Sequence, residues 1–120
     1  APVTITFSQL AGQTGNIFYA VFDSETQFPR GNTVASGSVS TATASVKLNL
    51  KPGTYAVSVF LDRNGNGRLD TNVLGIPKER FGFSNNPRIL TGAPSFNDCA
   101  VRILDQDNQL GIRLITLLDQ

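Results

Sequence analysis

The chain contains no histidine, no tryptophan and no methionine, and Cys99 is its only cysteine. The absence of histidine removes the commonest general base, the commonest metal ligand and the Ser-His and Cys-His pairs of nucleophilic catalysis. A single cysteine excludes an internal disulfide and a cysteine-based zinc site. Catalysis would have to depend on carboxylates, lysines, tyrosines or a bound metal, and we therefore predict that the protein is not an enzyme.

An excess of charge and long apolar runs are also missing. Ten basic and nine acidic residues give a formal net charge of +1, and without a basic cluster we expect no nucleic-acid partner. No apolar run approaches the roughly 20 residues that cross a bilayer, so we expect no membrane insertion. The chain begins at Ala1 rather than at methionine, which favours signal-peptide removal over the alternative of a trimmed chain. We therefore expect an extracytoplasmic protein, either periplasmic or secreted.

Apolar and polar side chains alternate through most of the chain, which is the pattern of half-buried β-strands. Turn-forming residues separate these segments about every 8–12 residues, as is typical of β-sandwiches. We predict an all-β fold, a single antiparallel β-sandwich of about seven strands over residues 1–120, in which a long irregular loop spans residues 62–97. The predicted inward rows are Val3, Ile5 and Phe7; Ala44, Val46, Leu48 and Leu50; Tyr55, Val57, Val59 and Leu61; Cys99, Val101 and Ile103; and Leu110, Ile112 and Leu114.

Three local features carry further structural predictions. Residues Val34 to Ser40 are rich in serine and glycine and form a weak strand, which we place at a sheet edge. Tyr55 follows the turn at Pro52-Gly53, a position from which a tyrosine hydroxyl can bond back to the backbone near the turn. Ser24 to Phe28 can form one helical turn, capped by its serine and stopped by the proline that follows.

The segment 62–70 has the spacing of a cation-binding loop. Side-chain oxygens fall at relative positions 1, 3, 5 and 9 and a glycine at position 6, as in the first part of an EF-hand. Calcium takes six to eight oxygens at about 2.3–2.6 Å, and alternate residues of a tightly wound loop can supply them. The candidate calcium ligands are Asp62, Asn64, Asn66, the carbonyl of Arg68, and Asp70.

The segment also departs from an EF-hand. Position 12 is Val73 instead of glutamate, and no helices are predicted on either side. Another group, such as Asp98, Glu79 or water, would have to complete the coordination, and binding would be weak, as in extracellular modules. The alternative is an ordinary Asn-Gly turn, because both residues tolerate left-handed backbone. The sequence leaves both interpretations open.

A second candidate site lies between residues 81 and 86. An aromatic ring beside amide side chains can stack on a sugar and bond to its hydroxyls, which would make this segment a ligand surface. The alternative is a small core under the long loop, formed by Phe81, Phe83 and Phe96, because irregular segments need such anchors. The residues of the possible ligand surface are Phe81, Phe83, Ser84, Asn85 and Asn86.

Several short motifs of the chain occur together in one known family. The motifs are Pro52-Gly53-Thr54-Tyr55-Ala56-Val57, Asp62-x-Asn64-x-Asn66-Gly67, Asp70-Thr71-Asn72, Gly75-Ile76-Pro77, Glu79, Gly82-Phe83-Ser84-Asn85-Asn86 and Pro94-Ser95-Phe96. In this combination they resemble a bacterial family of exported proteins that is known as domain of unknown function 2141. The resemblance implies export and a prealbumin-like or immunoglobulin-like Greek-key sandwich, but it implies no reaction and supplies no binding residues.

We therefore expect an extracytoplasmic binding or interaction module with a protein or glycan partner, stabilised by calcium through the 62–70 loop. One alternative is a structural accessory domain of an envelope assembly that binds no ligand. Two others are a carbohydrate-binding module and a metal-assisted hydrolase, because paired carboxylates can perform acid-base chemistry. The carboxylates available to such a hydrolase are Asp62, Asp70, Glu79 and Asp98.

Overall fold

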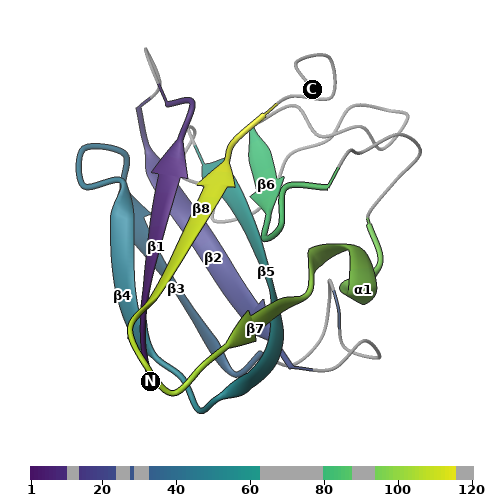
Figure 1. Ribbon diagram of the computed structural model, residues 1–120. Coiled ribbons are helices and arrows are strands. Elements are labelled where there is room, and N and C mark those ends of the chain that lie inside the picture. The colour runs from purple at the N-terminus through teal and green to yellow at the C-terminus, as the bar shows by residue number, and fades with distance from the viewer. Residues whose placement is uncertain (11–13, 24–27, 29–32, 63–79, 88–93, 116–120) are drawn as a thin grey trace.

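The computed structural model describes residues 1–10, 14–23, 28, 33–62, 80–87 and 94–115 (Figure 1). Eight strands and one short helix lie within these ranges. The helical turn predicted from Ser24 falls outside them except for Phe28. The elements are β1 (Pro2–Ser8), β2 (Asn16–Phe22), β3 (Ala35–Ser40), β4 (Ser45–Asn49), β5 (Gly53–Asp62), β6 (Phe81–Phe83), α1 (Phe96–Cys99), β7 (Val101–Ile103) and β8 (Asn108–Arg113).

The strands form two sheets, and no closed barrel is present among them. The three-stranded sheet has the order β4-β1-β8, and the five-stranded sheet has the order β3-β2-β5-β6, with β7 also paired to β5. In Figure 1 the smaller sheet lies in front of the larger one. The fold is therefore mostly β, as predicted. No helix within the described ranges has the length and apolar character of a bilayer span.

One strand pair contradicts the prediction of an antiparallel fold. β1 and β8 run parallel, from Val3 opposite Asn108 to Ser8 opposite Arg113. The remaining pairs between named strands are antiparallel. Parallel neighbours need a long connection between them, and β1 and β8 are joined by most of the chain. Periodicity reveals that a strand exists but contains no information on the direction of its neighbour, so the sequence could not show this pair.

A single hydrophobic core is shared by the two sheets. β1 contributes Val3, Ile5 and Phe7, and all three are buried. Predicted inward residues of β5, β7 and β8 join the same cluster, as do two residues of β2. These residues come from alternate positions, because successive side chains of a strand point to opposite faces. They are Tyr55, Val57, Val59 and Leu61; Ile103; Ile112 and Leu114; and Ile17 and Val21.

Two of the local predictions are confirmed. The weak strand is β3, which among the described strands pairs with β2 alone and so forms one edge of the larger sheet. The Tyr55 hydroxyl donates a 2.7 Å hydrogen bond to the carbonyl oxygen of Lys51, across the turn that precedes β5. This bond ties the start of β5 to the end of the preceding segment while the Tyr55 ring packs in the core.

The predicted irregular loop at 62–97 is wrong for two short segments. β6 pairs with β5 from Phe81 opposite Phe60 to Phe83 opposite Ser58, and α1 begins at Phe96. Neither segment could be recognised by periodicity, because three strand residues and four helical residues are too few to establish a repeat. Residues 63–79 and 88–93 of the loop lie outside the described ranges.

β6 joins the two sheets at a corner where only glycine fits. Phe81 exchanges backbone hydrogen bonds of 2.9 and 2.8 Å with Ile115, which follows β8. The intervening Gly82 faces the core, where a Cβ atom would lie 2.5 Å from the Arg113 carbonyl oxygen and 2.8 Å from Cγ2 of Ile112. The backbones of β6 and β8 therefore approach too closely for any side chain at position 82.

We expect Gly82→Ala to lower the free energy of unfolding by about 1–3 kcal/mol, because the added methyl group would overpack this corner. Gly111→Ala is the matched control, since a Cβ atom at position 111 meets nothing within 4 Å. Chemical denaturation of both variants measures the difference. Equal stability of the two variants would contradict the close approach of β6 to β8.

Candidate functional site

The outer face of the five-stranded sheet, which points away from the shared core, collects most of the aromatic side chains. Phe18, Ala20 and Phe22 lie on this face of β2, because Ile17 and Val21 face the core. Ser58 and Phe60 lie on the same face of β5, directly opposite Ala20 and Phe18. This face is only partly covered within the described residues, since Phe18, Ala20, Ser58 and Phe60 are all half-buried.

A hollow of about 360 Å³ lies on this face. Phe18 and Phe60 form one side of it, with their rings stacked at a centroid distance of 5.3 Å and an interplanar angle of 10°. Small side chains form the remainder, because the neighbouring strand positions carry alanine, glycine and serine. Beside the two phenylalanines, the lining residues are Tyr19, Ala20, Ser36, Gly37, Ser38 and Ser58.

The chemistry of the hollow is apolar with hydroxyls at its border. The stacked rings and Ala20 offer hydrocarbon surface, while Ser36 and Ser38 are exposed on β3. Sites of this composition bind ligands that combine a flat apolar part with hydrogen-bonding groups. The sequence contains one signal for this face. Phe18 and Phe60 occupy strand positions that would carry polar residues on an ordinary solvent-facing side.

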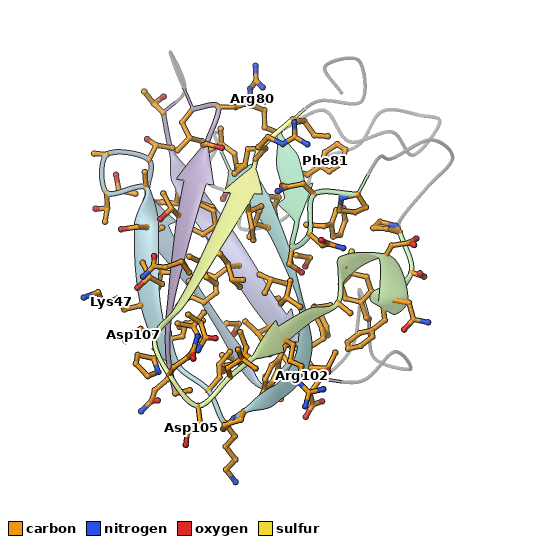
Figure 2. All side chains as sticks on the ribbon, viewed as in Figure 1. Lys47, Arg80, Phe81, Arg102, Asp105 and Asp107 are labelled. Atoms are coloured by element: carbon orange, nitrogen blue, oxygen red, sulfur yellow. The ribbon has the colours of Figure 1, made fainter. Side chains whose placement is uncertain are left out.

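A second group of aromatic rings continues from the hollow along the same face. Phe28 makes edge contacts with Phe22 at 5.3 Å and with Phe83 and Phe96 at 6.0 Å. Phe81 is buried, contacts Phe83 at 6.2 Å and packs with Phe60 and Ile115. These contacts form the small aromatic core that was the alternative to a ligand surface. Figure 2 labels Phe81, the first residue of β6.

Ser84, one of the predicted ligand-surface residues, lies inside the fold. It is 1% exposed. Its hydroxyl accepts a 2.9 Å hydrogen bond from the Val57 N–H and donates one to the carbonyl of Cys99, the last residue of α1. Its own N–H donates to the Val57 carbonyl at 2.9 Å. Ser84 therefore completes the edge of β5 between β7 and β6 and ties α1 to that edge.

The two asparagines of the predicted ligand surface adopt left-handed backbone, with φ of 68° at Asn85 and 45° at Asn86. The Asn86 amide group donates to the Gly111 carbonyl and accepts from the Arg113 N–H, both at 3.0 Å. It thereby covers the outer edge of β8 as a further strand would. Asn85 is exposed, and its amide donates to the Asp98 carbonyl at 3.1 Å.

We expect Ser84→Ala to reduce the free energy of unfolding by about 2 kcal/mol or more. The substitution leaves the Val57 N–H and the Cys99 carbonyl without their partner, and each such buried group costs about 1–3 kcal/mol. Ser58→Ala on the half-exposed outer face is the control, with an expected change within about 0.5 kcal/mol. Denaturant titration of both variants gives the comparison, and an equally small loss for Ser84→Ala would contradict the bridging role.

Only the first residue of the predicted cation loop can be placed. Asp62 ends β5, is 3% exposed and lies opposite Asn16 of β2. Asn64, Asn66, Arg68 and Asp70 lie outside the described ranges, as does Glu79, which was one candidate to complete the coordination.

Asp98, the other candidate to complete the coordination, belongs to a helix cap. Its carboxylate accepts a 3.3 Å hydrogen bond from the Ser95 N–H, and the Ser95 hydroxyl accepts one of 3.2 Å from the Asp98 N–H. This reciprocal pair is a capping box that starts α1. Among the described residues, no group of three or more carboxylate, cysteine or histidine side chains is placed to hold a metal ion.

Cys99, the single thiol, is fully buried. Desolvation raises its pKa to about 12, and the neighbouring Asp98 carboxylate adds to the increase. A thiol acts as a nucleophile through its thiolate, so at neutral pH Cys99 behaves as a small apolar core residue. The described part of the chain thus offers an apolar hollow and a network of structural hydrogen bonds.

Comparison with known proteins adds a family. Residues 5–110 match the family described as "Uncharacterized protein conserved in bacteria (DUF2141)". The chain belongs to this family. The match extends from β1 into β8 and so includes every element that lines the hollow, and it confirms the resemblance seen in the sequence. No curated protein and no solved structure matches the chain.

Proposed function

We propose that this member of the DUF2141 family is a non-enzymatic, extracytoplasmic binding module whose ligand site is the hollow on the outer face of the five-stranded sheet. The observation that supports it most is the stacked Phe18–Phe60 pair, half-buried beside a floor of small residues. Folded domains usually place polar side chains on a solvent-facing sheet side. Two aromatic rings kept there form a surface suited to an apolar group.

The proposal includes the finer form of the fold, a Greek-key β-sandwich of the prealbumin or immunoglobulin type. Support comes from the single core shared by the two sheets and from the hydrogen bond of Tyr55 to Lys51, which resembles the tyrosine corner of such sandwiches.

The ligand class that fits the hollow is a small molecule or side chain with one flat apolar face and several hydrogen-bonding groups. The apolar face would lie against Phe18, Phe60 and Ala20. The hydroxyls of Ser36, Ser38 and Ser58 would bond to the polar groups at the border. An aromatic residue of a protein partner and the less polar face of a sugar both have this chemistry.

The fluorescent probe 1-anilinonaphthalene-8-sulfonate tests the hollow, because it combines fused aromatic rings with a polar group. We expect saturable binding to the folded protein at about one site. Ala20→Phe should reduce this binding at least about tenfold by filling the hollow, which corresponds to about 1.4 kcal/mol of binding free energy.

Thr6→Phe is the control for this experiment, since it adds the same side chain to an exposed position of β1 in the other sheet. It should leave probe binding unchanged. If the probe does not bind the folded protein, or if both variants bind it as the unmodified chain does, the hollow is not a ligand site. That result would favour the alternative of an accessory domain without a ligand.

We further propose that calcium stabilises the domain through the 62–70 loop. Support comes from the oxygen spacing in the sequence and from the position of Asp62, whose side chain is buried where β5 passes into the loop. The ligands would be Asp62, Asn64, Asn66, the Arg68 carbonyl and Asp70. With only two carboxylates in this set, the affinity would be in the range of about 10⁻⁴–10⁻³ M.

Thermal unfolding in excess calcium and in excess chelator tests this proposal. A ligand that binds only the folded state at 100 times its Kd stabilises by about 2.7 kcal/mol, so the midpoint should rise by several degrees. Asp70→Asn should remove most of this rise, and Asp107→Asn, an exposed carboxylate at the turn before β8, should retain it. An unchanged midpoint at saturating calcium would leave the segment as a plain turn.

A further inference from the structure

The open edge of the five-stranded sheet points to a second copy of this chain as its partner. We propose that two molecules pair antiparallel through β3, so that their five-stranded sheets form one continuous sheet across a two-fold axis. The pairing uses the backbone groups at the edge of β3, whereas the hollow uses side chains on the outer face of the same strand, and it does not depend on the proposed ligand. It rests on the backbone groups of β3, on the charges of the sheet edges and on the way the other edges are covered.

The backbone groups of Ser36 and Ser38 point away from β2. The Thr41 N–H donates to the Gly15 carbonyl at 3.2 Å, and hydrogen bonding to one neighbour alternates along an antiparallel strand. Odd-numbered residues of β3 therefore bond to β2. Ser36 and Ser38 are left with two N–H groups and two carbonyls directed to the open edge. A row of unpaired groups of this kind is a template for another strand.

The other edges within the described residues are protected. β4 exposes Lys47, which projects outward in Figure 2, and β7 exposes Arg102. The outer edge of β8 is covered by the Asn86 amide group, and β6 is bonded to Ile115. Lysine on an edge strand and a covered edge are common devices against strand-to-strand association.

Within the part of the chain that the structure describes, β3 has none of these devices. The chain carries no charged residue between Gly31 and Val46, and β3 itself contains no proline. Two copies of β3 can therefore face one another without like-charge repulsion. Two copies of β4 would bring their Lys47 side chains together, and like charges across a strand pair are destabilising. The neutral edge thus favours an identical partner over a charged one.

One strand register gives a hydrogen-bond partner to each outward N–H and carbonyl group of Ser36 and Ser38. If the two-fold axis passes beside Gly37, Ser36 of each molecule lies opposite Ser38 of the other, and the two pairs form four hydrogen bonds. An axis beside Ser38 would instead place Ser36 of one molecule opposite Ser40 of the other, and this pair would need the Ser40 carbonyl as an acceptor. That carbonyl already accepts two 3.0 Å bonds from the Thr43 and Ala44 N–H groups. We therefore place the axis at Gly37.

The association stops at a dimer. Pairing through a two-fold axis uses the same surface on both molecules and leaves no copy of it free. The continuous sheet would end at β6 in each molecule, where the edge is bonded to Ile115. The hollow borders on Ser36, Gly37 and Ser38, so the two hollows would lie on the same face of the shared sheet, on either side of the axis.

Sedimentation equilibrium over a wide concentration range tests the dimer, together with a variant that blocks the edge. Ser38→Pro removes an outward N–H without removing a bond to β2, and proline is accepted at such edge positions. We expect a concentration-dependent dimer for the unmodified chain and at least a tenfold weaker association for Ser38→Pro. If this variant does not fold, a double variant that carries both Ser36→Lys and Ser38→Lys should weaken the association through charge repulsion.

A thiol cross-link tests the register. With the axis at Gly37, the two Ser38 positions are diagonal neighbours about 7–8 Å apart. A short bis-maleimide should therefore join two Ser38→Cys molecules, while Lys47→Cys on β4 should not be cross-linked. Background from Cys99 is small because that thiol is buried. Three results would overturn the proposal. They are a monomer at every concentration, dimerisation that neither Ser38→Pro nor the double lysine variant weakens, and cross-linking of Lys47→Cys equal to that of Ser38→Cys.

Discussion

The architecture depends on how the second edge of β5 satisfies its backbone groups. One edge of β5 is paired with β2 from Ala56 to Asp62. Among the described residues, the other edge meets two short strands, β7 at Gly53–Tyr55 and β6 at Ser58–Phe60. The gap between them is closed by Ser84, whose backbone and hydroxyl bond to Val57. An unpaired buried amide is costly. The hydrogen bonds of Ser84 therefore stabilise the arrangement in which β6 and β7 share one edge of β5.

Much of the fold could be predicted from the sequence, because apolar and polar side chains alternate with a period of two residues along half-buried strands. The rows on β1 and β5, the tyrosine bond at Tyr55 and the edge position of β3 all emerged from local pattern and turn chemistry. The parallel pairing of β1 with β8 and the short strand β6 did not. The first depends on contacts between distant segments, and the second is too short to show a repeat.

The candidate sites show the same division between local and distant information. The sequence identified Ser84, Asn85 and Asn86 as polar residues beside aromatics, but it could not show that Ser84 and Asn86 bond to β5 and β8. The hollow was missed because its residues come from three strands, and only the pairing of Phe18 with Phe60 brings them together. Strand alternation predicts on which face of the sheet a side chain lies, whereas the residues beside it on neighbouring strands depend on the sheet topology.

The position of β1 has a consequence for the order in which the domain can form. β1 lies in the middle of its sheet, yet it is the first strand in the chain and one of its neighbours, β8, is the last. The Asn108 side chain bonds to the Pro2 carbonyl across a separation of 106 residues. The smaller sheet therefore closes only after nearly the whole chain is available, and such distant pairing makes folding slow.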